Sequence, residues 1–485
     1  MPCWLLCFAA ACGRTRDEAP LPFAGAGAFN PPADASAPGR HCLALINEQV
    51  QIVHFDEPSS PITTTVSDSQ GASSVAFTND GARLAYAVGT EQGPWQVSAA
   101  SVLSGEALGV TWSLPSGGAP TLFWVGNESL FAHRVYEPSS LLRAADGSVS
   151  DIGIIRFLNR AADESSLVAM AESRLLYVGA ASAAWSEPIS GSWSARLAAD
   201  GRGLAVFSSE ELPAFDLPVP TTRVRWSPPT TPPCSPTPQA QCPDPPRYGL
   251  NDVEWGSSDT PIATEFRAVT PNSTHIALVF IAPGATEPLS APPASFRVLG
   301  RSWGVLRSGA WFMLENPDDP TTDAWWLRSV APNGEVTRAQ GPQSFAQRAL
   351  ASGDESQVFV VSYARSTERT TVEVVALPVR NGSVTTPVFS TNQRVDELWS
   401  QPRGSRVLIA TSDPDQAGNT TPLYYLAAGD STARALPSGL HDVRWTPDGQ
   451  GFIGITGQSV VYLAVASPDR LITLGRGSYV LPKHW

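Results

Sequence analysis

The sequence predicts an all-β fold built from repeated four-stranded units, and three observations support this. The segment Ser73–Val88 returns near the other end of the chain as His441–Ile455. Each copy reads as an apolar strand, a polar turn centred on Asp-Gly and a second apolar strand. No stretch sustains the hydrophobic period of a helix. Gly and Pro account for 39 and 44 of the 485 residues, as expected of a chain with many turns.

Further copies of this hairpin occur along the chain. Their turns lie at Gly126-Asn127, Asp163-Glu164, Asp200-Gly201, Asn272-Ser273, Ser352–Asp354 and Arg403-Gly404. Asp, Asn and Gly suit such turns because their side chains bond nearby backbone or they accept a positive φ. Most copies are followed by more strand candidates, such as Leu423–Leu426 and Val460–Leu463. One unit therefore comprises about four strands over roughly 37 to 50 residues.

A four-stranded unit of this size cannot bury both of its faces alone. Stacking neighbouring units face to face around a common axis buries them, and that arrangement is a β-propeller. We therefore predict a single β-propeller over residues 41–485, with about eight blades and a range of seven to nine. One further unit could lie around Ser302–Leu314. An open solenoid is the alternative, and it needs terminal caps.

The two ends of the predicted propeller complement each other. The first segment supplies three strands, Cys42–Asn47, Val50–Phe55 and Ile62–Val66, without a preceding inner strand. An extra strand follows the last full unit, in Gly477–Trp485. We predict that Tyr479–Leu481 forms the inner strand of the first blade. The propeller would then close by pairing of the N- and C-terminal strands, which removes exposed sheet edges.

The N-terminus carries a candidate address signal. Pro2–Ala11 is apolar and uncharged, and Cys12 follows it before a charged segment. Small residues before a cysteine, after an apolar run, resemble the lipobox of bacterial lipoproteins. The resemblance implies lipidation at Cys12, a signal segment at residues 1–12 and an address in the bacterial cell envelope, as an outer-membrane lipoprotein facing the periplasm or the surface. A cleaved secretory signal and a mis-assigned start of a cytoplasmic protein are the alternatives.

Residues 13–40 are rich in Pro, Ala and Gly and show no hydrophobic period. We interpret them as a flexible tether between the anchor and the propeller. A second proline-rich stretch, at about residues 218–249, reads as an insertion that is either a partner-binding arm or a passive excursion.

The cysteines suit an oxidising compartment. Cys234 and Cys242 both lie in the proline-rich insertion. A disulfide between them would close a small loop and stabilise it, and two free surface thiols are the alternative. Cys42 lies in an apolar strand and is predicted to be buried as a small hydrophobic side chain.

Two hairpins resemble a known repeat family. Ala76–Tyr86 and Arg444–Ile453 resemble the WD40-like, or PD40, repeat of TolB-type propellers, which also occurs in the propeller of prolyl-oligopeptidase-like enzymes. The resemblance implies a propeller fold and, by analogy, a periplasmic scaffold. It carries over no catalytic residue, because the chain has no Gly-x-Ser-x-Gly elbow.

Composition and motifs exclude several functions. A formal net charge of −13 disfavours nucleic acid as a partner. No Walker loop and no G-x-G-x-x-G after a strand occurs, so we expect no nucleotide and no cofactor. No run of 18 apolar residues is present, so contact with a membrane would depend on the lipid anchor alone.

Candidates for chemistry are few. The six histidines occur singly, without the spacing of a metal site: His41, His54, His133, His275, His441 and His484. Asp413 and Asp415, in an acidic loop, are weak candidates for a Ca²⁺ site, and a solvated connection is the alternative. We predict no catalytic residue.

The sequence favours a non-catalytic, envelope-tethered β-propeller that binds or scaffolds a protein or glycan partner. The alternative is an envelope hydrolase or lyase with its active site at the mouth of the propeller channel. The sequence leaves the question of enzymatic activity open and favours a protein that is not an enzyme.

Overall fold

The computed structural model describes most of residues 41–482. Residues 57–59, 163, 172, 180–182, 187, 191–192, 209–211, 226–247, 256–261, 271–272, 282–302, 307, 316–323, 332–334, 413–421, 428–429 and 431 lie outside the description. The described residues form 38 strands, and the regular structure among them is all β. None of their elements is a helix of the length and apolarity needed to cross a bilayer.

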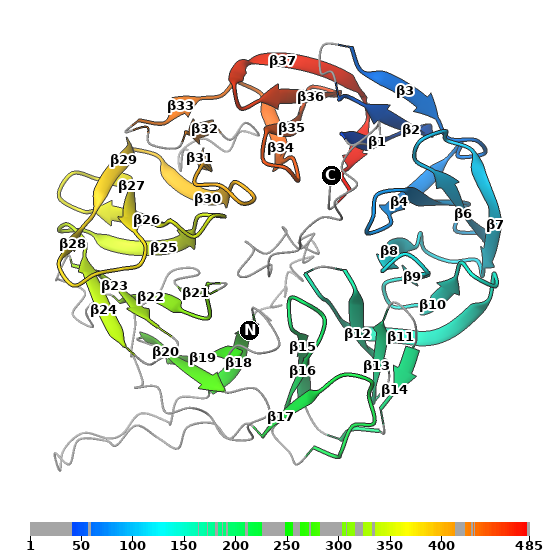
Figure 1. Cartoon of the computed structure of the whole chain (residues 1–485), viewed down its shortest axis with the longest axis horizontal. Coiled ribbons are helices and arrows are strands. Elements are labelled where there is room, and N and C mark those ends of the chain that lie inside the picture. The colour runs from blue at the N-terminus through cyan, green and yellow to red at the C-terminus, as the bar shows by residue number, and fades with distance from the viewer. Residues whose placement is uncertain are drawn as a thin grey trace, which may run out of the picture.

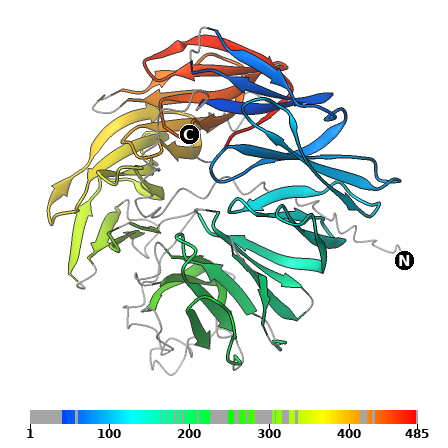
Figure 2. The same ribbon diagram turned by 45° about the vertical axis from the view of Figure 1, so that its right-hand side comes forward.

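The strands form nine sheets arranged in a ring around a central axis (Figures 1 and 2). This arrangement confirms the predicted β-propeller. The first two sheets contain β38 (Ser478–Val480), β1 (Cys42–Asn47), β2 (Gln49–His54) and β3 (Ile62–Thr65), and β4 (Ala72–Phe77), β5 (Arg83–Val88), β6 (Trp95–Ser101) and β7 (Ala107–Leu114).

A seven-stranded sheet comes next. It contains β8 (Thr121–Val125), β9 (Ser129–His133), β10 (Pro138–Arg143), β11 (Val149–Arg160), β12 (Ser166–Ala171), β13 (Arg174–Gly179) and β14 (Ala183–Trp185). The long strand β11 pairs with β10 through its first half and with β12 through its second half. It therefore serves two successive four-stranded units.

Two three-stranded sheets follow, made of β15 (Trp193–Leu197), β16 (Leu204–Ser208) and β17 (Thr221–Arg225), and of β18 (Tyr248–Glu254), β19 (Ile262–Thr270) and β20 (Ser273–Ile281). In the first of them β17 runs parallel to β16. The strands β17 and β18 occupy the two ends of the predicted insertion at 218–249, and its residues 226–247 lie outside the description.

Four sheets complete the ring. One contains β21 (Trp303–Val305), β22 (Trp311–Glu315), β23 (Trp326–Val330), β24 (Val336–Gln340) and the parallel strand β28 (Ser383–Val384); the next contains β25 (Phe345–Ala351), β26 (Gln357–Ala364), β27 (Arg369–Ala376) and β29 (Thr386–Thr391). The last two contain β30 (Arg394–Ser400), β31 (Val407–Ser412), β32 (Leu423–Leu426) and β33 (Arg434–Ala435), and β34 (Leu440–Trp445), β35 (Gly451–Thr456), β36 (Ser459–Ala464) and β37 (Ser467–Arg476).

The nine sheets fall within the predicted range of seven to nine blades, above the single value of about eight. Nine sheets, one of which holds two units, amount to ten units in the described part of the chain. The count of turns missed the first unit, whose inner strand comes from the far end of the chain. The unit that begins at β21 lies where the sequence analysis places a possible further unit, around Ser302–Leu314.

Apolar side chains fill the spaces between neighbouring units. One cluster joins Trp95 and Trp112 of the second sheet to Trp124 of the next. Another joins Leu408 of β31 to Phe452 of β35. Each sheet thus covers its faces with its neighbours, as the propeller prediction requires.

The ring closes where the first and last described strands meet. Strand β38 pairs antiparallel with β1, with Leu45 opposite Tyr479. The Tyr479 hydroxyl shares its one proton between the carbonyl oxygens of Asp442 (2.5 Å) and Ile453 (3.1 Å), both in the last sheet. The predicted closure by the C-terminal strand is confirmed, one residue earlier than Tyr479–Leu481.

The recurring sequence motif is a hydrogen-bonded turn. In the first copy, the Thr78 hydroxyl donates to Asp80 (2.6 Å) and accepts the amide of Arg83 (3.0 Å). Ser352 with Asp354 and Thr446 with Asp448 make the same bonds, to the amides of Gln357 and Gly451 respectively. The hydroxyl and the carboxylate recur in these three turns because they stabilise the turn, which accounts for the motif without a catalytic role.

These turns also connect neighbouring units around the ring. The amide of Asp80 donates to the side chain of Asn127 (3.3 Å), in the next unit. The amide of Asp354 donates to the carbonyl of Gly404 (3.2 Å), and the Gln401 side chain donates to that of Gly449 (2.7 Å). We call this series of contacts the turn belt.

Candidate functional site

The loop between β9 and β10, residues 134–137, combines an exposed aromatic side chain with a strained backbone. Tyr136 is 89% exposed, and its φ of 61° lies in the left-handed region. Neighbouring Val135 is 54% exposed. A bulky residue seldom adopts this conformation, so the surrounding structure must hold it in place.

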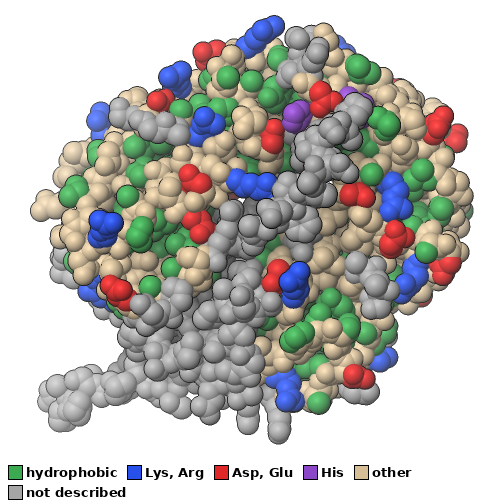
Figure 3. Space-filling view, in the orientation of Figure 1, with side chains coloured by type: hydrophobic (Ala, Val, Ile, Leu, Met, Phe, Trp, Pro, Cys, Tyr) green, Lys and Arg blue, Asp and Glu red, His purple; other side chains and the backbone are tan. Residues whose placement is uncertain are grey.

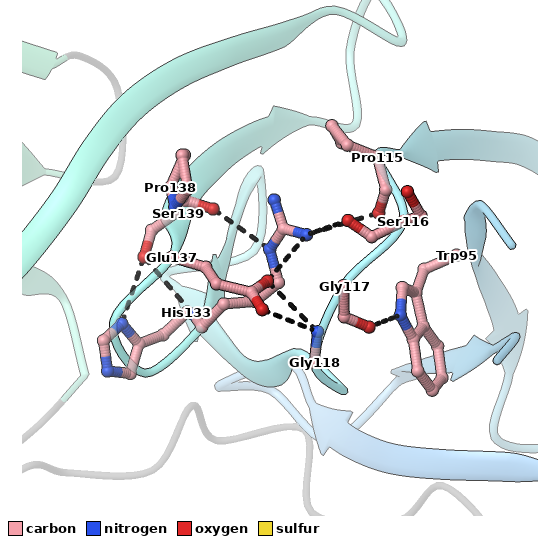
Figure 4. A network of polar contacts seen from close by, with 10 residues as sticks. Trp95, Pro115, Ser116, Gly117, Gly118, His133, Glu137, Pro138 and Ser139 are labelled. Atoms are coloured by element: carbon pink, nitrogen blue, oxygen red, sulfur yellow. Dashed lines mark hydrogen bonds and ion pairs between the residues drawn. The ribbon is translucent and has the colours of Figure 1, made fainter. Parts of the chain in front are cut away.

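Arg134 supplies most of that support, through the network of polar contacts in which Figure 4 labels its partners Pro115, Ser116, Glu137 and Pro138. Its side chain is only 4% exposed. Nε donates to the carbonyl of Pro138 (3.0 Å), and Nη1 donates to the carbonyls of Pro115 (3.2 Å) and Ser116 (3.3 Å). The same Nη1 lies 3.3 Å from the Glu137 carboxylate. A buried guanidinium needs such partners, and here they fix the path of the loop.

Glu137 connects this loop to the segment between β7 and β8. Both carboxylate oxygens accept the amide of Gly118, at 3.0 and 3.1 Å. A Cβ atom at Gly117 would overlap the Glu137 carboxylate, and φ there is 140°, so this position requires glycine. The Trp95 indole donates to the carbonyl of Gly117 (2.9 Å). The loop is therefore anchored to two units of the ring.

A serine and a histidine lie side by side below the loop. His133 Nδ1 is 3.1 Å from Ser139 Oγ, which also accepts the amide of Arg134 (3.3 Å). Burial lowers the pKa of His133, so the ring is neutral at pH 7. Ser139 has no exposed surface, so in this conformation its hydroxyl cannot reach a substrate. The pair supports the loop and does not form a nucleophile with its base.

Some residues considered from the sequence lie outside the description: Cys12, Cys234, Cys242, Asp413, Asp415 and His484. Cys42 is buried, as predicted, and burial, followed by the charge of Asp56, raises the pKa of its thiol to about 12. Among the described residues, no three His, Cys, Asp or Glu side chains gather as a metal site would require.

Sequence reasoning missed Arg134, Tyr136 and Glu137. The only local sign is that an arginine and a glutamate flank two residues in a short connection between strands. Most partners of Arg134 are backbone carbonyls, which leave no mark on the sequence.

The face seen in Figure 3 carries interspersed acidic and basic side chains among hydrophobic and polar ones. Its described surface offers no continuous basic patch of the kind that binds a phosphate backbone.

Comparison with known proteins defines the class of this protein by structure alone. No family model and no curated protein matches the sequence. A eukaryotic initiation factor is similar in structure, with a TM-score of 0.52 at 10% identity over 92% of this chain and 99% of the other. At this identity the likeness supports the fold and nothing finer: the chain is a β-propeller protein.

Two further solved structures show weaker likeness. An oligogalacturonate lyase from Vibrio parahaemolyticus has a TM-score of 0.38 at 11% identity, over 79% of this chain and 85% of its own. The C-terminal WD40 domain of Sif2 has a TM-score of 0.31 at 10% identity, over 78% of this chain and 91% of its own. One is an enzyme by name and the other a WD40 domain, so they favour neither a catalytic nor a binding role.

Proposed function

We propose that this propeller is a non-catalytic binding or scaffolding module that presents the β9–β10 loop to a protein or glycan partner. The observation that supports this proposal is the contrast between the exposed Tyr136 and the buried Arg134 beneath it. Exposed aromatic side chains are the commonest anchors of binding interfaces. A strained loop that the fold keeps in one conformation is a frequent mark of a functional site.

The loop is prepared for binding because its support does not depend on a partner. Arg134, Glu137 and Gly118 hold the backbone in the free protein. A partner that covers Tyr136 would therefore bear little of the entropic cost of ordering the loop, which favours affinity.

We further propose that the propeller is tethered to the cell envelope through lipid on Cys12, with residues 13–40 as the spacer. The basis is the lipobox-like sequence before Cys12. Mass spectrometry of the N-terminus of the mature protein tests this: a lipid-modified Cys12 is expected, and an intact Met1–Ala11 segment would contradict it.

Crosslinking tests the binding role. A photoreactive amino acid at position 136 is expected to give one discrete product in native membranes. The same group at Val384, which is 83% exposed on β28, serves as the control and should give none. An excess of unlabelled wild-type protein should suppress the product, and an excess of the Tyr136→Ala variant should not. Equal suppression by both proteins would contradict a role for the Tyr136 side chain.

A further inference from the structure

The turn belt changes its chemistry where the ring closes. In the other contacts described above, neighbouring turns meet through amides and carbonyls, which do not titrate near neutral pH. In most units a short turn joins the inner strand to the second strand. In the first unit these two strands are β38 and β1, which are far apart in the sequence, so no such turn joins them. His41, directly before β1, occupies this place.

His41 lies between two carboxylates. Its Nε2 is 3.3 Å from Asp448, in the motif turn of the last sheet, and its Nδ1 is 3.3 Å from Asp56, which follows β2. The backbone amide of His41 also donates to Asp56 (2.9 Å). The imidazole stacks on Phe55, with ring centroids 6.3 Å apart. One side chain thus bridges the first and last sheets.

The charge of the imidazole decides how many of these contacts are hydrogen bonds. A neutral imidazole carries one N–H and can donate to one carboxylate, whereas an imidazolium donates to both and attracts both. The side chains of His41, Asp56 and Asp448 are 36%, 44% and 25% exposed, so protons exchange freely and solvent weakens the attraction.

Three described ionisable groups near His41 have pKa values shifted away from neutral pH. Burial, and then the charge of Asp448, raises the pKa of Tyr462, which packs on Phe55. Burial also raises the pKa of Cys42 to about 12. Burial opposes ionisation of Asp448, but hydrogen bonds from His41, the Gln450 amide and Thr446 hold the pKa of this carboxyl below its usual value.

We propose that His41 is a pH-dependent clasp, which holds the first sheet to the last through both carboxylates when it is protonated and through at most one of these hydrogen bonds when it is neutral. The sign follows from the partners: both are carboxylates, so protonation of the ring strengthens the bridge. The contact is therefore strongest in acid, where the ring is protonated, and weakens as the ring loses its proton in alkali.

Hydrogen exchange of the full chain tests the clasp. Protection of the β1 and β38 amides would be compared with that of β26, on another part of the ring, for the wild type and His41→Asn. At about pH 5.5, the variant is expected to lose roughly threefold protection at β1 and β38, the size of a partly exposed ion pair. At about pH 8.5, where a neutral ring keeps at most one of these hydrogen bonds, the difference between the two proteins should be clearly smaller.

His441→Asn is the matched control, because His441 pairs with Asp442 on its own strand and does not bridge two sheets. It should leave β1 and β38 unchanged at both pH values. Asp448→Asn, which keeps His41, should reproduce the loss at low pH. The proposal is overturned if His41→Asn changes protection equally at both pH values or at neither, or if His441→Asn has the same effect.

Discussion

At the scale of single residues, the buried guanidinium of Arg134 has the largest set of polar contacts in the candidate site. Arg134 contacts three backbone carbonyls and one carboxylate, and each contact depends on the planar, forked shape of the guanidinium. A strained tyrosine lies two residues away. The contacts of Arg134 therefore stabilise the loop enough to hold Tyr136 in its left-handed backbone conformation.

Replacement of Arg134 should show this dependence. Arg134→Ala leaves the Glu137 carboxylate without its cation and three carbonyls without a donor, so we expect a loss of about 3 kcal/mol in the free energy of unfolding. Arg134→Lys keeps the charge but cannot reach all partners, and should lose less. Denaturant unfolding measures both, and equal losses would argue against the forked geometry.

Relief of the strain at Tyr136 should separate stability from function. Glycine has no Cβ and adopts a positive φ without strain. We therefore expect the free energy of unfolding of Tyr136→Gly to equal that of Tyr136→Ala or to exceed it by up to about 1 kcal/mol. Both variants lack the aromatic ring and should fail equally in the crosslinking competition. A less stable glycine variant in urea melts would show that the loop is not strained.

A buried carboxyl gives the protein a pH dependence of its own. Glu373, on β27, is 1% exposed and accepts the Ser362 hydroxyl (2.7 Å); burial raises its pKa. The folded state thus prefers the protonated form, so its contribution to stability is full below the unfolded value, near about 4.5, and declines as the pH rises through the folded value.

Glu373→Gln should remove this effect. The variant is expected to gain stability relative to the wild type as the pH rises from about 4.5 to 7, and unfolding curves across that interval measure the difference. A difference that shrinks with rising pH would contradict the assignment.

At the scale of elements, the hairpin turn is the part that the sequence describes best. Thr78, Asp80 and Gly81 each have a defined role, with Gly81 at a φ of 69°. The strands that flank such turns were predictable because the motif fixes both the turn and the apolar runs beside it. The unit at β21 has its own turn at Gly309 (φ of 77°), where Leu306 and Ser308 occupy the positions of the motif's hydroxyl and carboxylate.

The buried hydroxyl of this turn should matter to stability. Thr78→Val keeps the shape but leaves the Arg83 amide without its acceptor, so we expect a loss of about 1 to 2 kcal/mol in unfolding free energy. Thr78→Ser keeps the hydroxyl and should lose less than half of that. If the two variants unfold alike, the hydrogen bonds of the motif contribute little.

At the scale of the whole molecule, the sequence was sufficient for the ring and insufficient for the site. The need to cover apolar sheet faces predicts a propeller, and an unpaired first segment predicts its closure. Both depend on patterns that repeat. The β9–β10 loop occurs once, and its support comes from backbone atoms of Pro115, Ser116 and Pro138. Such contacts arise only after the units have been placed side by side.

Removal of the closing strand should destabilise the whole ring. Deletion of residues 477–485 exposes an edge of β1 and removes Tyr479 and Leu481 from the cluster that they form with Leu43 and Leu45. We expect a lower melting temperature with a single, cooperative transition. Tyr479→Phe, which keeps the strand and loses two hydrogen bonds, should have a smaller effect. Thermal melting unchanged by the deletion would argue against closure at this point.

The shared strand β11 gives one arc of the ring a different mechanical character. At the other described boundaries between units, neighbours contact each other mainly through side chains, with single backbone hydrogen bonds such as Asp354 to Gly404 and the short ladder between β24 and β28. Here one uninterrupted strand takes part in two ladders: its first half pairs with β10 and its second half pairs with β12. A force that pulls on either unit therefore acts on β11, and the two units can separate only if one of these two ladders breaks.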